Sequence, residues 1–304
     1  MKCLVTGGAG FIASHIVDRL IEEGNKVVVV DDFSTGNKDN LNPKAKLYEM
    51  DICDPNLEAV FQSEKPDYVS HHAGQVSVVR SVREPEFDVK VNIIGSLNVL
   101  QQSLKYSVKK IIFSSTGGTV YGEPEYLPVD EDHPTRPLCP YAIDKLTFEK
   151  YLYMYGVVYG LNYTILRYSN VYGPRQDPHG EAGVVAIFTQ KMIDGVQPTI
   201  FGDGTATRDY VYIDDVVSAN MLAFEHGDRG IYNISTGIET DVNTIFALLK
   251  AEFGFPKDAI YSDKRPGELQ RIALSYEKAK SELGWSPKVT FKEGIKKTVK
   301  YYAR

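Results

Sequence analysis

A glycine-rich segment between a predicted strand and a predicted helix constrains the fold of this chain most. Cys3–Thr6 is an apolar run typical of a buried strand, and Phe11–Glu23 has the pattern of a helix that ends at Gly24. Between them, residues 8–13 fit the pattern G-x-G-x-x-G/A. Glycines there permit a tight turn and let the backbone approach a pyrophosphate, which the helix N-terminus binds through its N–H groups. The segment therefore predicts a dinucleotide-binding βαβ unit.

A carboxylate at Asp31 follows the second predicted strand, Val27–Val30. An acidic residue at this place typically binds the ribose hydroxyls of the adenosine. A 2′-phosphate about 4 Å from it would meet roughly 4 kcal/mol of repulsion at an effective dielectric constant of about 20. Asp32 adds a second negative charge, and no arginine follows to offset it. The cofactor expected from these residues is NAD, in preference to NADP.

Strand and helix patterns alternate through the first half of the chain. Apolar runs predict strands at Tyr68–His72, Lys110–Ser114 and Tyr163–Arg167, and helices are predicted to begin near Pro85 and Pro140. Such alternation predicts an α/β fold with a Rossmann-type doubly wound parallel sheet.

The pattern changes after Asn170. Residues 173–181 are rich in glycine, proline and charged residues, which indicates a long loop over a site. We expect a strand at 208–213 and helices near 214–226, 242–252 and 292–302. The expected domains are an NAD-binding Rossmann domain, 1–169 plus about 208–235, and a smaller C-terminal α/β domain that binds the substrate, about 170–207 plus 236–304.

The composition excludes several classes of protein. A net charge of −6 argues against a nucleic-acid-binding protein, which would usually carry a basic surplus. The three cysteines are scattered and predict reduced thiols, and neither a leader nor a membrane-spanning run is expected, so a cytoplasmic protein is predicted. His71 and His72 are adjacent on a predicted strand and point to opposite faces, so no metal site is expected there.

Tyr141 and Lys145 are four residues apart on the helix predicted after Pro140, so their side chains share a face. An ammonium near a phenol favours the phenolate and lowers a pKa that is ordinarily about 10. Next to a bound nicotinamide, such a phenol is a general base for a sugar hydroxyl. We therefore predict that this pair is catalytic.

With these residues in place, the chain resembles the extended branch of the short-chain dehydrogenase/reductase family. Within that branch it is similar to UDP-glucose 4-epimerases and related nucleotide-sugar epimerases. The resemblance covers essentially the whole length and is carried by the motifs Thr6–His15, Asp31, Asp51–Ile52, His72–Gly74, Val91–Gly95, Ser114–Thr116, Tyr141–Lys145, Arg167–Pro174, Arg208–Tyr210 and Arg265–Glu268.

The resemblance implies a role for each matched residue. Tyr141 would be the acid/base, Lys145 would tune it and hold the nicotinamide ribose, and Thr116 would hydrogen-bond the sugar 4-hydroxyl. The implied cofactor site is Gly7, Gly10, Phe11, Ile12, Asp31, Asp32, Phe33, Ser34, Thr35, Gly36, Asp51, Ile52, His72, Ala73, Gly74, Asn92, Ser114, Ser115, Tyr141, Lys145 and Tyr168. The implied substrate site is Thr116, Tyr141, Asn170, Gly183, Val184, Thr199, Phe201, Arg208, Arg265 and Glu268. A homodimer is implied in the same way.

Departures from the family pattern limit the choice of reaction. Gly117 and Gly118 replace the Asp-Glu pair of the related 4,6-dehydratases, which argues against dehydration. Asp177 would repel a sugar carboxylate, which disfavours a uronate. Ile272 aligns with a tyrosine that narrows the sugar pocket in some relatives, which leaves room for an N-acetylated sugar.

These observations predict an NAD-dependent enzyme that interconverts UDP-glucose and UDP-galactose. Two alternatives remain open at this point. One is a 4-epimerase for a UDP-N-acetylhexosamine or a UDP-uronate, and the other is a noncatalytic NAD-binding sensor on the same fold.

Overall fold

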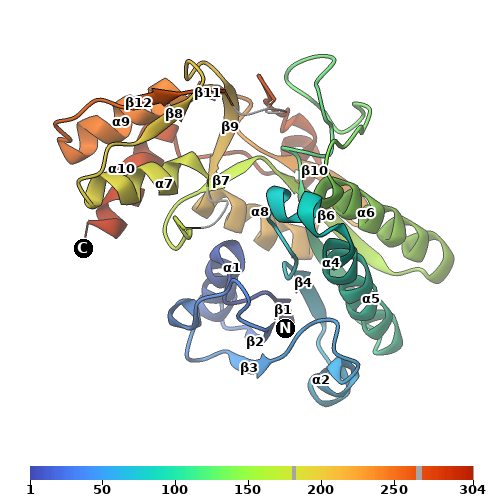
Figure 1. Cartoon of the computed structure of the whole chain (residues 1–304). Coiled ribbons are helices and arrows are strands. Elements are labelled where there is room, and N and C mark those ends of the chain that lie inside the picture. Colours follow the sequence, from blue (N-terminus) through green and yellow to red (C-terminus); the bar gives the residue numbers. More distant parts are fainter. Residues whose placement is uncertain (180–182, 265–268, 304) are drawn as a thin grey trace.

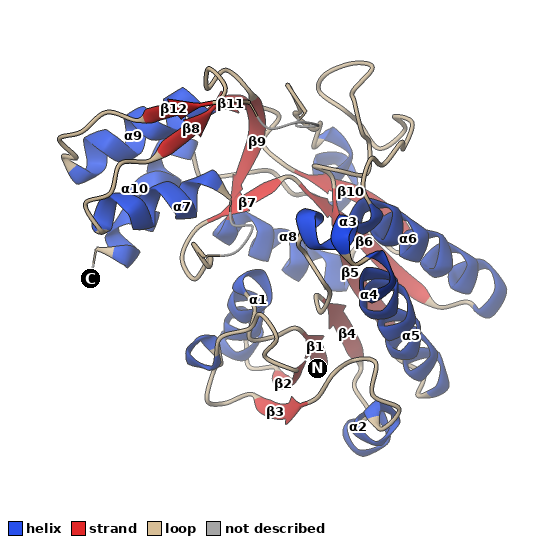
Figure 2. Ribbon diagram, viewed as in Figure 1, coloured by secondary structure: helices blue, strands red, loops and turns tan. Residues whose placement is uncertain are grey.

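Seven parallel strands form one central sheet (Figures 1 and 2). The computed structural model describes residues 1–179, 183–264 and 269–303. The sheet has the order β10-β6-β5-β4-β1-β2-β3, and its strands are β1 (Lys2–Thr6), β2 (Lys26–Asp31), β3 (Lys46–Glu49), β4 (Tyr68–His71), β5 (Lys110–Thr116), β6 (Asn162–Tyr168) and β10 (Gly230–Ile234). The predicted α/β fold with a doubly wound parallel sheet is confirmed.

Apolar side chains alternate between the two faces of the sheet. Val27 and Val29 of β2 pack in one core cluster, while Val28 and Val30 pack in a second one on the opposite face. The first cluster includes residues of α1 (Phe11–Glu22) and α8 (Ile213–Glu225). The second includes residues of α2 (Leu57–Glu64), α5 (Ser96–Lys105) and α6 (Pro140–Tyr159). Because helices cover both faces, the strands are apolar along nearly their whole length.

The remaining elements lie at the end of the sheet and in two small sheets. These are β11 (Glu239–Asp241), β9 (Thr207–Tyr212) and β7 (Asn170–Tyr172) in one, and β12 (Ile260–Ser262) with β8 (Thr199–Phe201) in the other. The helices α7 (Val184–Ile193), α9 (Val242–Phe253) and α10 (Phe291–Tyr302) lie together beside them, at the left of Figure 1. Among the described residues, no helix is long and apolar enough to cross a bilayer.

The sequence analysis predicted many of the regular elements, but it missed others, among them the helices α2 and α7 and the central strand β10. Helices begin at Pro85 and Pro140, as expected. The first of them, α4 (Pro85–Val89), is followed directly by a π-helical segment, η2 (Lys90–Gly95), and then by α5. The elements that were not predicted are β3, α2, β7, α7, β8, β10, β11, β12, α3 (Val78–Arg83) and the short segments η1 (Lys38–Asn40) and η3 (Ala279–Leu283).

The strand order reverses its direction at β1. This strand has β2 on one side and β4 on the other, so the connections after β1 and β4 run to opposite sides. In doubly wound sheets, ligands bind in the crevice outside the carboxyl ends of the strands at such a point. The carboxyl ends of β1, β2, β4 and β5 are therefore where a site is expected.

Candidate functional site

The glycine-rich turn after β1 leaves no space for side chains. Gly7 has a φ of +69°, and a Cβ there would lie 2.7 Å from the backbone nitrogen of Ala73, after β4. At Gly8 it would lie 2.7 Å from Val29 Cγ1. Gly10 precedes α1 and brings no side chain, so the N–H groups of the first helical turn remain open to an anion. The turn therefore fits a pyrophosphate.

Asp31 joins this turn to the loop after β2. Its Oδ2 accepts a hydrogen bond from Ala9 N at 2.8 Å, and its Oδ1 accepts one from Phe33 N at 2.8 Å. Burial raises the pKa of Asp31, and these two hydrogen bonds oppose that rise. Each carboxylate oxygen keeps a second lone pair for a ribose hydroxyl. In the same loop, Asp32 accepts hydrogen bonds from the backbone and hydroxyl of Ser34.

Tyr141, Thr116 and Lys145 meet where β5 ends and α6 begins. Thr116 is close enough to the Tyr141 hydroxyl to lower its pKa, and Thr116 Oγ1 lies 3.0 Å from Thr119 Oγ1. Lys145 Nζ donates to Ser114 O at 3.0 Å and lies 5.9 Å from the centre of the Tyr141 ring. The structure thus brings together the three predicted catalytic side chains, which come from two elements, β5 and α6.

The predicted lowering of the Tyr141 pKa by Lys145 is wrong for the protein alone. Burial raises the pKa of Tyr141, with Cys139 and Asp88 adding to the rise, while the hydrogen bond from Thr116 lowers it. Burial also lowers the pKa of Lys145 to about 8, against the opposing charges of Asp88 and Glu149. Loss of solvent around the phenol and the ammonium outweighs the attraction between them.

Ser115 points away from its neighbours on β5. Its hydroxyl donates to Glu149 Oε1 at 2.6 Å, and Arg167 Nε donates to the same oxygen at 3.0 Å. Arg167 Nη1 also donates to the Tyr121 hydroxyl at 2.9 Å. This interior network ties β5, β6 and α6 together behind the site, and the sequence analysis missed it. Strand alternation was the available signal, because Ser115 must face opposite to Ser114 and Thr116.

The segment after β4 forms a second wall of the crevice. A Cβ at Gly74 would lie 2.7 Å from Asn92 Oδ1 and 3.6 Å from Lys145 Nζ. The His72 ring lies parallel to that of Tyr168 with centroids 6.5 Å apart, and burial lowers the pKa of His72 to about 3. The Tyr168 hydroxyl donates a hydrogen bond to Asn220 Oδ1. The Tyr168 ring therefore lies between Asn220 and the His72 ring of this wall.

Two further predicted residues lie at the side of the crevice next to β2. Asp51 Oδ1 accepts a hydrogen bond from Cys53 N at 2.8 Å. Ile52 is buried in the core cluster with Val28 and Val30. His71 points to the opposite face from His72, as the alternation predicted, and its ring nitrogens lie 2.7 Å from Thr6 Oγ1 and 2.9 Å from Ser96 Oγ.

The predicted sugar-diphosphate residues lie on the small sheets. Asn170 of β7 pairs with Tyr210 of β9, and Arg208, two residues earlier, shares a face of β9 with Tyr210. Asn170 Oδ1 lies 3.7 Å from where a Cβ of Gly118 would be, so β7 approaches the end of β5. Gly183 and Val184 are at the start of α7, and Thr199 and Phe201 are in β8. Arg265 and Glu268 lie outside the described residues.

Two residues that bear on the choice of reaction are crowded. A Cβ at Gly117 would lie 2.3 Å from Leu274 Cδ1 and 3.2 Å from Arg167 O, so a side chain there would displace its neighbours. Ile272 is 1% exposed and packs with Val120, Tyr121, Val129 and Leu274. Its side chain is therefore part of a core cluster, and it does not widen an open pocket.

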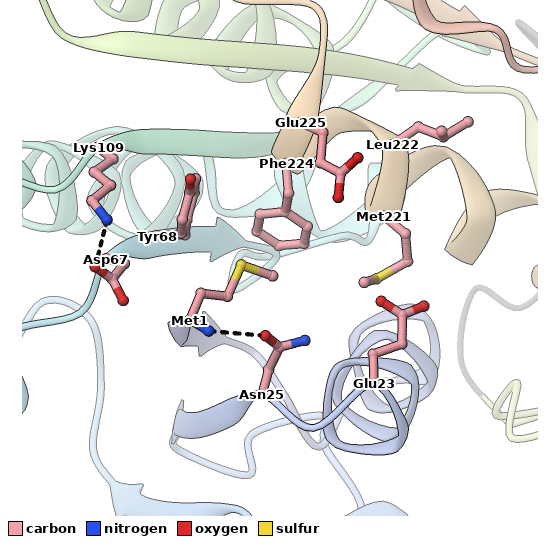
Figure 3. Close-up of a pocket in the computed structure, with 10 residues that line it drawn as sticks. All are labelled: Met1, Glu23, Asn25, Asp67, Tyr68, Lys109, Met221, Leu222, Phe224 and Glu225. Carbon is pink, nitrogen blue, oxygen red and sulfur yellow. Dashed lines mark hydrogen bonds and ion pairs between the residues drawn. The ribbon is translucent and has the colours of Figure 1, made fainter.

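A separate groove lies at the opposite edge of the sheet, where β1 and β4 begin (Figure 3). The amino group of Met1 donates to Asn25 Oδ1 at 3.1 Å, and Lys109 forms an ion pair with Asp67 at 2.9 Å. The described site residues do not line this groove. Because ligands of such sheets bind at the carboxyl edge, we assign the groove no part in the site.

Known proteins were compared with the chain. A model of the NAD dependent epimerase/dehydratase family matches residues 3–235. A putative UDP-glucose 4-epimerase of Methanocaldococcus jannaschii is 51% identical over 298 residues, which are 98% of this chain and 97% of that protein.

Two solved structures are also similar. A UDP-glucose 4-epimerase of Thermotoga maritima with UDP-glucose is 54% identical, has a TM-score of 0.98 and covers 100% of this chain and 99% of its own. A UDP-glucose 4-epimerase of Thermus thermophilus in complex with NAD is 44% identical, has a TM-score of 0.95 and shows the same two coverages. The similarity thus extends over both halves of the chain.

Proposed function

This chain belongs to the NAD dependent epimerase/dehydratase family, and we propose that it interconverts UDP-glucose and UDP-galactose by transient oxidation at C4 of the sugar, with NAD tightly bound. The observation that carries the proposal is the meeting of Tyr141, Thr116 and Lys145 beside the glycine-rich turn and its second wall. A binding protein needs the turn and Asp31, but it does not need a buried phenol with a hydroxyl partner. The epimerases of M. jannaschii, T. maritima and T. thermophilus support the same reaction.

The residues present fit NAD. The turn from Gly7 to Gly10 and the first turn of α1 would hold the pyrophosphate, and Asp31 would hold the adenosine ribose. Asp51 and Ile52 would lie at the adenine, and Lys145 would hold the nicotinamide ribose. When bound, NAD supplies the hydride acceptor and donor for C4.

Tyr141 carries the proton transfer. Its hydroxyl oxygen takes the proton of the sugar 4-hydroxyl as C4 is oxidised, and it returns a proton when C4 is reduced from the other face. Thr116, which is close enough to the Tyr141 hydroxyl to lower its pKa, would hold the 4-oxygen near the phenol. Lys145 Nζ lies 5.9 Å from the centre of the Tyr141 ring and would hold the nicotinamide ribose beside it.

The diphosphate would stay bound while the sugar rotates in the pocket. Arg208 and Asn170, on neighbouring strands, and the predicted Arg265 would bind the phosphate oxygens, since guanidinium groups bind them in pairs. Gly183, Val184, Thr199 and Phe201 would enclose the uracil, and Glu268 its ribose.

The first experiment follows UDP-glucose formed from UDP-galactose by the purified protein without added NAD. Formation of UDP-glucose is the expected result and would also show a resident cofactor. Parallel reactions with UDP-N-acetylgalactosamine and UDP-galacturonate test the two alternative substrates. Absence of product from all three, also with NAD added, would refute the proposal.

Dehydration is the reaction that the site disfavours most. The 4,6-dehydratases use an Asp-Glu pair where this chain has Gly117 and Gly118, and the Gly117 position lacks space for a carboxylate. Product formation is therefore expected without loss of water, which mass spectrometry of the sugar nucleotide would check.

Three predictions from the sequence complete the proposal. The Rossmann part would bind NAD, and residues of about 170–207 and 236–304 would bind the nucleotide sugar. A homodimer would bury the exposed apolar side chains Tyr153, Val157 and Val158 of α6. The protein would be cytoplasmic; light scattering and cell fractionation test the last two.

A further inference from the structure

Two buried carboxyl groups face each other next to the catalytic residues. Asp88 of α4 is fully buried, and Asp144 of α6 is 5% exposed. The helices α4 and α6 are in contact, and a hydrogen bond with the Asp88 carboxyl contributes to raising the pKa of Asp144. The Oδ2 atom of each is enclosed, and neither accepts a hydrogen bond from any N–H or O–H donor among the described residues. Because two carboxylates cannot share a hydrogen bond without a proton, the pair must hold one.

Asp88 accepts hydrogen bonds from side chains at the second wall, the segment after β4, which would face the nicotinamide end of the proposed cofactor site. Its Oδ1 accepts hydrogen bonds from Asn92 Nδ2 at 3.2 Å and from Gln75 Nε2 at 2.5 Å. Asn92 Oδ1 in turn accepts a hydrogen bond from Gln75 N at 2.9 Å and lies against Gly74. Asp88 is therefore connected, through two amide side chains, to the segment that follows β4.

Asp144 is part of the first turns of α6. It follows Tyr141 by three residues, which places it on the neighbouring part of the helix surface, and it immediately precedes Lys145. The negative charge of Asp88 acts on both Tyr141 and Lys145. The hydrogen bond between Asp88 and Asp144 thus joins the wall to the helix that carries both catalytic side chains.

We propose that Asp88 and Asp144 share a single proton and are positioning residues for Tyr141 and Lys145. The pair holds α6 against the wall, and its one negative charge keeps Lys145 protonated. The positioning role rests on the function proposed above, whereas the shared proton does not.

The pair also introduces a dependence on pH. Burial and the neighbouring Asp88 raise the pKa of Asp144 to about 7. Above that pH the shared proton is lost, and two adjacent carboxylates repel each other across the contact between α4 and α6. The charged side chains of the helices packed there are Arg80 and Arg83 of α3, Glu86 of α4, Lys90 of η2, Lys105 of α5, and Lys145, Glu149 and Lys150 of α6. Of these groups and Asp88, only Asp88 shifts the Asp144 pKa.

The sign of the effect on stability follows from linkage. The pKa of Asp144 is higher in the folded protein than its unfolded value of about 3.9, so the folded state binds more protons between these two values. The contribution of the pair to stability is complete below about pH 4 and is lost as the pH rises to about 7.

Asp144→Asn tests the proposal in the full-length protein. An amide keeps the shape and can donate its N–H to Asp88, but it cannot titrate. We expect loss of the infrared carbonyl band of a buried protonated acid and a flatter dependence of Tm on pH between about 4 and 7. Asp88→Asn should remove the same band, and it serves if the first variant folds poorly. Asp194→Asn, an exposed acid at the end of α7, is the control and should leave both readouts as in the wild type.

Turnover tests the positioning role. In the wild type, kcat should fall above pH 7 by up to about tenfold per pH unit, and Asp144→Asn should lose this fall. Unchanged band and Tm profile in both Asn variants would refute the shared proton. A lost band with an unchanged kcat profile would refute the positioning role, and absence of turnover in the wild type would instead refute the proposed function.

Discussion

The glycine-rich turn before α1 and the first turns of α6 both face the carboxyl end of the sheet, but they are built in opposite ways. The turn works by the absence of side chains, since a Cβ at Gly7 or Gly8 would lie 2.7 Å from a neighbouring atom. The start of α6 instead places side chains in the interior: Asp144, Lys145 and Glu149 are buried, and Tyr141 is partly buried. Adding atoms should therefore damage the turn, whereas removing atoms should damage α6.

The largest effect is expected from Tyr141→Phe. This change removes the proposed proton carrier and one hydrogen bond, so kcat should fall by about 10²–10⁴-fold. NAD binding should persist, because the turn before α1 is untouched. Steady-state kinetics and fluorescence titration with NAD measure the two effects. Tyr153→Phe, at an exposed position of the same helix, should retain wild-type kcat; equal loss in both variants would contradict the assignment.

Deeper along α6, Glu149→Gln should destabilise the fold. Glu149 and Arg167 form a buried ion pair with side chains 1% and 3% exposed, and breaking it leaves a charge without its partner. Such losses are about 3–5 kcal/mol in the free energy of unfolding. Urea denaturation measures it. The control is Glu22→Gln, whose ion pair with Arg19 lies on the surface and should contribute less than about 1 kcal/mol.

Comparing the stability losses of Gly7→Ala and Gly24→Ala separates the effect of crowding at the turn from the effect of a positive φ. Both glycines have a positive φ, but a Cβ at Gly24 meets nothing within 4 Å. A positive φ costs alanine about 1–2 kcal/mol, and overpacking adds about 1–3 kcal/mol at Gly7 only. Gly7→Ala should also weaken NAD binding, by calorimetry, while Gly24→Ala should not. Equal stability loss in the two variants would show that the close approach to Ala73 is unimportant.

The smallest effect concerns the choice of cofactor. Asp31→Asn removes the negative charge that would repel a 2′-phosphate, so the preference for NAD over NADP should fall by about 10–100-fold, within the roughly 4 kcal/mol estimated for the full repulsion. The ratio of the two dissociation constants measures this. Asp32→Asn is the control, because Asp32 is exposed and its carboxylate accepts hydrogen bonds from Ser34 of its own loop. A larger effect at Asp32 would mean that Asp31 does not face the ribose.

Several regular elements were predictable because local patterns determine them, although α7 and the central strand β10 were missed. The apolar run at 27–30 and the glycine turn identified the first βαβ unit within one or two residues of its observed bounds. By contrast, β3 has half-buried and exposed residues only, and β7, β8 and β11 are three residues long. Such strands exist because of their partners, so periodicity carries no signal for them.

Site prediction met a similar limit. The motif at Tyr141–Lys145 placed two residues on one helix face, and the helix has that geometry. The direction of the Tyr141 pKa shift was wrong, because the degree of burial outweighs the nearest charge and sequence spacing does not report burial. The orientation of Ser115 toward Glu149 and the Asp88–Asp144 contact join residues 34 and 56 positions apart, and no short motif contains both members.

By itself, the sequence determined the class of fold and the glycine-rich turn, and it identified the acid expected to select NAD and the side chains expected to transfer a proton. These depend on residue type and on spacings within one element, which are local properties of the chain. Only the tertiary structure decided which carboxyl groups are enclosed, which of them must share a proton and which glycine has no space for a side chain. Those properties follow from contacts between distant segments and from the exclusion of water, which exist only once the chain has folded.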